Sequence, residues 1–118
     1  MSGRILFIED SPNIRDMCVR ILSNAGYEVE SAATGQEAFR RLRSDPAFDL
    51  VVIDFALPDM SGLELVDHVR SKIPAIIISG YLSLQDRDSI ATIENCEVLL
   101  KPFQPQELIA AVKRTLGQ

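Results

Sequence analysis

Cysteine, histidine and basic residues are scarce in this sequence of 118 residues, which has two cysteines, one histidine and 12 lysines and arginines. Cys18 and Cys96 lie far apart and form no metal-binding or redox spacing, so we expect free, buried thiols in a reducing compartment. The net charge of -5 argues against broad binding to nucleic acid or to an anionic membrane. No stretch resembles a membrane span or a signal peptide, so we expect a cytoplasmic protein without membrane insertion.

The length of the chain predicts one domain over residues 1–118. The hydrophobic fraction of 47% is ordinary for a globular protein and is enough for a buried core. The sequence has no internal repeat, low-complexity segment or linker that would divide this domain.

Apolar runs that end in polar or charged residues recur along the chain. Residues 50–53, Leu-Val-Val-Ile, are typical of a strand buried on both faces of a parallel sheet, and Asp54 follows them directly. Turn-forming residues then fill the segment up to Gly62. Similar patterns predict the other strands at 4–8, 27–33, 74–79 and 96–100.

Helical patterns separate these strands. Ser11 and Pro12 are a favoured helix start, and the helix that follows should bury one face made of Ile14, Met17, Cys18, Ile21 and Leu22. Residues 34–37 and 61–64 have the pattern of capping boxes that open the second and third helices. Residues 83–94 predict a polar fourth helix that is held to the core only by Ile90, Ala91 and Ile93. Pro105 is predicted to begin the last helix.

Five strands that alternate with five helices predict an α/β fold, the doubly wound (βα)5 flavodoxin-like three-layer sandwich. The parallel sheet should have the strand order 2-1-3-4-5, because right-handed crossovers leave few alternatives. In such a sheet, the residues after each strand meet at one edge, and ligands bind there.

Five polar side chains are predicted to meet at this edge: Glu9, Asp10, Asp54, Ser79 and Lys101. Clustered carboxylates repel one another, and a hard divalent cation such as Mg²⁺ would make the cluster tolerable. A carboxylate beside Mg²⁺ and a lysine can accept a phosphoryl group, while a serine hydroxyl donates to one phosphoryl oxygen. The product would be an aspartyl phosphate.

Over nearly its whole length the sequence resembles the receiver domain of bacterial two-component response regulators. The matching segments are Glu9-Asp10, Asp54, Leu57-Pro58-Asp59-Met60-Ser61-Gly62, Ser79 and Lys101-Pro102-Phe103. The resemblance implies that Asp54 accepts a phosphoryl group from a sensor histidine kinase or a histidine phosphotransfer protein. The protein would then signal to a downstream protein target by a conformational change, without acting as a turnover enzyme.

The resemblance also implies roles for the other residues of the site. Asp10, Asp54 and the Ala56 carbonyl would bind Mg²⁺ directly, and Glu9 would act through a water molecule. Ser79 and Lys101 would hold the phosphoryl group, and the peptide bond between Lys101 and Pro102 would be cis.

The sequence departs from the family pattern in places. Val98 stands where the family often has an aromatic switch residue, and Tyr81 is expected to be a partly exposed loop residue instead. The connection around residues 71–73 is shorter than in many relatives, and we expect no output domain after Gln118.

Other functions fit the residues less well. A flavodoxin would need hydroxyls and amides around a phosphate, whereas the first loop here is acidic and contains Pro12. An aspartate-nucleophile phosphohydrolase usually has an acidic residue two positions after the nucleophile, where this chain has Ala56. A scaffold that is never phosphorylated is disfavoured, because no residue of the expected site is missing. His68 is expected to be a solvated residue in the middle of a helix and not a phosphorylated histidine.

Overall fold

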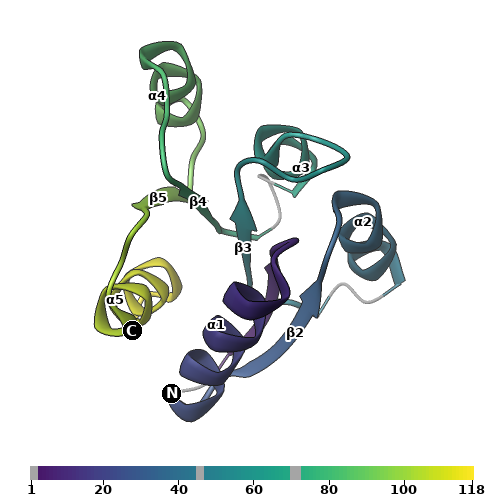
Figure 1. Ribbon diagram of the computed structural model, residues 1–118, viewed down its shortest axis with the longest axis vertical. Helices are drawn as coiled ribbons and strands as arrows, with labels where there is room; N and C mark the ends of the chain where they lie inside the picture. Colours follow the sequence, from purple (N-terminus) through teal and green to yellow (C-terminus); the bar gives the residue numbers. More distant parts are fainter. Residues whose placement is uncertain (1–2, 45–46, 70–72) are drawn as a thin grey trace.

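Five β-strands alternate with five α-helices (Figure 1) in the computed structural model, which describes residues 3–44, 47–69 and 73–118. The strands are β1 (Arg4–Ile8), β2 (Glu28–Ala32), β3 (Leu50–Asp54), β4 (Ala75–Ser79) and β5 (Cys96–Leu100). The helices are α1 (Pro12–Asn24), α2 (Gly35–Ser44), α3 (Gly62–Val69), α4 (Leu84–Ala91) and α5 (Pro105–Leu116). Each predicted element is therefore confirmed, with bounds that differ by a few residues.

The strands form one parallel sheet with the order β2-β1-β3-β4-β5, which confirms the predicted topology. All five residues of β3 are buried, since this strand has neighbours on both sides and helices on both faces. Ile8 of β1 lies opposite Ile53, and Asp54 lies opposite Ile78 of β4. The carboxyl ends of the three central strands therefore lie side by side at one edge of the sheet.

Two hydrophobic cores cover the two faces of the sheet, because successive side chains of a strand point to opposite faces. Ile5 and Phe7 pack with residues of α1 and α5, while Leu6 and Ile8 pack with residues of α2, α3 and α4. Figure 1 shows α1 and α5 on one side of the sheet and the other three helices on the opposite side. Burial of each such side chain stabilises the fold by roughly 1.5–3 kcal/mol. These cores fix the strand ends on which the polar residues lie.

Two predictions about helix faces are wrong. Met17 is 49% exposed instead of buried, because it lines an open groove together with Pro102 and Phe103. Helix α4 ends at Ala91 instead of residue 94, and Ala91 is exposed, so Ile90 is the buried anchor of this helix. Ser83 caps α4 as expected and accepts a hydrogen bond from the N–H of Asp86.

The two predicted capping boxes also differ in detail. Thr34 accepts a hydrogen bond from the N–H of Glu37, but the Glu37 carboxylate accepts from the N–H of Ala33, one residue before the cap. The Ser61 hydroxyl accepts from the N–H of Leu63, whereas the N–H of Glu64 donates to the Ser61 carbonyl.

Part of the short connection predicted at residues 71–73 lies outside the described residues. Among the described segments, no helix has the length and apolar character needed to cross a membrane.

Candidate functional site

The main chain continues the sheet pairing beyond the ends of β1 and β3. The N–H of Glu9 donates to the Ala32 carbonyl at 3.0 Å, and the N–H of Phe55 donates to the Ile78 carbonyl at 2.9 Å. These bonds hold Glu9 and the residues after Asp54 in an extended conformation at the sheet edge. The two carboxylates are thus positioned by the rigid sheet and not by a mobile loop.

An acidic cluster forms where β1 and β3 end. One carboxylate oxygen from each of Glu9, Asp10 and Asp54 lies within 4.8 Å of the others. Glu9 and Asp54 are buried, with 2% and 8% of their surface exposed, while Asp10 is exposed. The structure therefore brings together the three acidic residues expected from the sequence, with one side of the cluster open to solvent.

Lys101 supplies a positive charge to this cluster. Its Nζ lies 3.4 Å from Glu9 Oε1 and 3.6 Å from Asp54 Oδ2. The N–H of Lys101 donates to the Ser79 carbonyl at 2.8 Å, which fixes the start of the segment after β5. The peptide bond between Lys101 and Pro102 is cis, as predicted.

The proton affinity of Glu9 reflects its surroundings. Burial and a hydrogen bond with Asp54 raise the pKa of Glu9 to about 7, although the Ser11 N–H and Lys101 oppose this shift. The cause is that two carboxylates share a buried space with one nearby cation. The site therefore holds more negative charge than Lys101 neutralises once Glu9 is ionised.

Ser79 lies at the same edge but its hydroxyl has local partners. Ser79 is 5% exposed, and its Oγ donates to the Tyr81 carbonyl and accepts from the Tyr81 N–H. The side chain of Tyr81 is in the exposed loop, as expected. Val98, in the position of the family's aromatic switch, is partly buried against the core under α4.

The loop between β3 and α3 packs closely against Asp54. The N–H of Ala56 donates to Asp54 Oδ1 at 3.2 Å, and the N–H of Gly62 donates to the Phe55 carbonyl at 2.8 Å. A Cβ atom on Gly62 would lie 3.0 Å from the Asp54 carbonyl oxygen and 3.0 Å from the Phe55 Cα. Glycine is therefore needed where this loop returns to the phosphoacceptor candidate.

Sequence reasoning missed two contacts that support the site. Arg15 donates from Nη1 to the Glu9 carbonyl at 3.0 Å, which ties α1 to the end of β1. Asp59 accepts hydrogen bonds from the N–H groups of Gly35 and Gln36, both at 2.9 Å. Asp59 thereby joins the loop after β3 to the first turn of α2, a contact between residues 24 positions apart that no local pattern signals.

The donor set of the cluster suits a hard divalent cation. Three carboxylates converge, two are buried, and one side is open for water or a phosphoryl group. A basic nitrogen lies on the same side of Asp54, where it can attract an incoming anion. The geometry therefore suits a divalent cation and an incoming anion side by side.

The family model of the response regulator receiver domain matches residues 5–113. The chain belongs to this family. The receiver domain is 35% identical over 118 residues to the regulatory protein VanR of Enterococcus faecium, and the match covers 98% of this chain and 51% of VanR. It is 29% identical to the response regulator receiver protein CpdR of Brucella abortus, with 96% of both chains covered.

Solved structures show the same similarity. A CheY-like receiver domain protein from Methanospirillum hungatei has a TM-score of 0.91 and 32% identity, over 99% of this chain and 95% of that one. The chemotaxis protein CheY4 of Vibrio cholerae has a TM-score of 0.89 and 31% identity, over 98% of this chain and all of that one.

Several curated relatives are longer proteins, and the receiver domain spans about half of their length, for example 48% of the regulatory protein YrkP of Bacillus subtilis. The protein described here is thus a response regulator receiver domain of two-component signalling.

Proposed function

We propose that Asp54 is the phosphoacceptor of this receiver domain and that residues 1–118 act as one signalling unit. The observation that carries the proposal is the position of Lys101 Nζ, 3.6 Å from Asp54 Oδ2, beside the buried Glu9. A carboxylate at a rigid strand end next to a fixed cation is suited to attack a phosphorus atom. The chemistry needs mainly alignment and positive charge around the transferred group.

In the proposed reaction, an Asp54 carboxylate oxygen forms a bond to the phosphorus of a partner's phosphohistidine. The P–N bond breaks, and its electron pair leaves with the imidazole, so that Asp54 becomes an acyl phosphate. Lys101 stabilises the charge on the phosphoryl oxygens, and the Ser79 hydroxyl turns to donate to one of them. Slow loss of the phosphoryl group to water would reset the domain, so we propose a self-modifying signalling protein and not a turnover enzyme.

Magnesium fits the residues that are present. Asp10, Asp54 and the Ala56 carbonyl would hold Mg²⁺, with Glu9 acting through water, since carboxylate and carbonyl oxygens are its preferred ligands. When bound, Mg²⁺ would neutralise the carboxylates and the phosphoryl oxygens. Bound Mg²⁺ would favour the ionised form of Glu9, whose pKa is otherwise raised by burial and by Asp54.

The partners follow from this chemistry. We propose that a sensor histidine kinase or a histidine phosphotransfer protein supplies the phosphoryl group, and that a downstream protein reads the phosphorylated state. The acidic chain favours protein partners over direct contact with nucleic acid. We further propose that the domain works in the bacterial cytoplasm, where such kinases expose their phosphohistidines.

Intact-mass analysis after incubation with acetyl phosphate tests the assignment. We expect one phosphoryl adduct in the presence of Mg²⁺, little adduct with a chelator, and no adduct in Asp54→Asn. Asp88→Asn is the matched control, because it makes the same chemical change on the exposed side of α4. An adduct of unchanged amount in Asp54→Asn would refute the assignment.

A further inference from the structure

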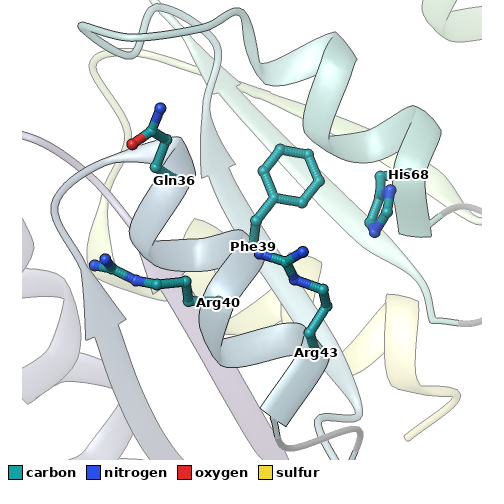
Figure 2. Close-up of a pocket in the computed structure, with 5 residues that line it drawn as sticks. All are labelled: Gln36, Phe39, Arg40, Arg43 and His68. Atoms are coloured by element: carbon teal, nitrogen blue, oxygen red, sulfur yellow. The ribbon is translucent and has the colours of Figure 1, made fainter.

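A groove of about 400 Å³ lies between α2 and α3, and Gln36, Phe39, Arg40, Arg43 and His68 line it (Figure 2). Four of these residues follow one another at helical spacing on α2, and His68 is in the last turn of α3. None of them belongs to the acidic cluster, although the main-chain N–H of Gln36 donates to Asp59 in the loop after β3. The groove is large enough for a small ligand, since ligand pockets usually have volumes of roughly 300–1,000 Å³.

Two aromatic rings form one wall of the groove. The Phe39 and His68 rings meet edge to face, with centroids 4.6 Å apart and an angle of 84° between the planes. Phe39 is partly buried against the core, so its ring is held in place, whereas His68 is exposed. Such a fixed apolar surface is a favourable contact for a planar ring.

The charge of the groove contrasts with that of the whole chain. Arg40 and Arg43 are exposed, and within the described residues neither forms an ion pair with a carboxylate. Arg41, between them on the same helix, lies 2.7 Å from Glu30 and 3.7 Å from Glu37. In a chain of net charge -5, two exposed arginines that form no ion pair within the described residues make the groove locally attractive to anions.

Stabilisation of the helix ends is the competing explanation, since cations in a last turn favour the helix dipole. However, Figure 2 shows the Arg43 side chain extending toward Phe39, and Arg40 is four residues from the helix end. A guanidinium beside an aromatic ring can bind an anion in two parallel hydrogen bonds while the ring contacts the rest of the ligand.

We propose that the groove binds a small organic anion with a planar ring, of about the size of a mononucleotide. The ring would pack on Phe39 and His68, and a phosphate or carboxylate would bind Arg43. Arg40, which in Figure 2 points away from the two rings, would turn toward the anion when the ligand binds. The site would be separate from the phosphoacceptor and would not depend on it.

NMR titration of the labelled domain with adenosine 5′-monophosphate tests the proposal, with adenosine and inorganic phosphate as the two partial probes. We expect saturable shifts of the amides in residues 36–43 and 63–68, and at least tenfold weaker binding of each partial probe. Arg43→Gln should weaken nucleotide binding about tenfold, which is the usual effect of losing a hydrogen bond to a charged group. Phe39→Leu should weaken nucleotide binding but leave phosphate binding unchanged.

Arg41→Gln is the matched control, because it removes the same charge from the same helix at a residue that faces Glu30. This variant should bind the nucleotide within about twofold of the wild type, because the Arg41 guanidinium is already paired with Glu30 and Glu37. Equal losses in Arg41→Gln and Arg43→Gln, or shifts that do not saturate, would overturn the proposal. Binding of a poly-glutamate peptide, but not of the nucleotide, would also overturn it, because the groove would then be a docking surface for an acidic protein.

Discussion

The Ser79 hydroxyl donates a hydrogen bond to the Tyr81 carbonyl at 2.7 Å and accepts one from the Tyr81 N–H at 3.2 Å. These two bonds tie the end of β4 to the loop before α4. A hydroxyl has one proton, so Ser79 cannot donate to a phosphoryl group and to Tyr81 at the same time. Phosphorylation of Asp54 would therefore remove the bond to the Tyr81 carbonyl and loosen Tyr81, a residue that is 78% exposed.

This relationship predicts where the phosphorylated state differs from the resting state. Helix α4 has Ile90 as its buried residue, so it should respond more readily than β5 or α5. With beryllium fluoride as phosphate mimic, amide exchange should change most in residues 80–94 and little in residues 96–100. In Ser79→Ala, residues 80–82 should exchange faster without the mimic and change little when it is added. A largest change around Val98 and α5 would contradict this mechanism.

Removal of a carboxylate from the acidic cluster should stabilise the metal-free protein. Asp54→Asn removes one of three neighbouring charges, and Lys101 keeps Glu9 as its partner. We expect the variant to unfold at higher urea concentration in a chelating buffer, with a gain of roughly 1 kcal/mol in the free energy of unfolding.

Magnesium should make the wild type more stable to unfolding than Asp54→Asn. The wild type should gain roughly 2.7 kcal/mol at a Mg²⁺ concentration of one hundred times its dissociation constant, and Asp54→Asn should gain less. Asp88→Asn again serves as the control and should behave as the wild type. Equal stabilisation of all three proteins by Mg²⁺ would mean that Asp54 is not a metal ligand.

Gly62→Ala should destabilise the domain by about 1–3 kcal/mol, because the added methyl group meets main-chain atoms that cannot easily move. A Cβ at this position would lie 3.0 Å from the Asp54 carbonyl oxygen and from the Phe55 Cα. Gly80→Ala is the control, since no atom lies within 4 Å of its added Cβ. Urea unfolding of both variants checks the difference, and equal effects would show that the contact at Gly62 relaxes without cost.

The sheet and the acidic cluster could be predicted because each strand is marked by a short run of neighbouring apolar residues that ends in a polar one. A short apolar run such as Leu50–Ile53, rich in β-branched residues and followed by turn residues, favours a strand in the middle of a sheet, and parallel topology then brings Asp54 to Glu9. The exposure of Met17 could not be predicted, because the helical pattern does not show that the groove beside Pro102 stays uncovered. The two bonds of Asp59 depend on how a loop folds back onto α2, which is a property of the assembled domain.

Asp59 also supports a prediction about pH. Its hydrogen bond from the N–H of Gly35, together with that from Gln36, lowers the pKa of Asp59 below its usual value of 3.8. A carboxyl whose pKa is lower in the folded state than in the unfolded state stabilises the fold at pH values above the unfolded pKa. This contribution is lost as the pH falls through the pKa of the folded state, because the protonated carboxyl binds the two N–H groups less well.

We therefore expect Asp59→Asn to cost about 1 kcal/mol near neutral pH, because the amide keeps only one of the two acceptor oxygens and loses the negative charge beside the start of α2. The difference from wild type should shrink below about pH 4, where the Asp59 carboxyl of the unfolded wild-type chain begins to take up a proton while that of the folded chain is still ionised. Urea unfolding of both proteins at several pH values, in a chelating buffer, measures this difference directly. Asp88→Asn should show no comparable change, since the exposed carboxylate of Asp88 lies on α4 and not beside α2. A difference for Asp59→Asn that stays constant down to about pH 3 would mean that the carboxylate charge contributes nothing to the bonds with α2.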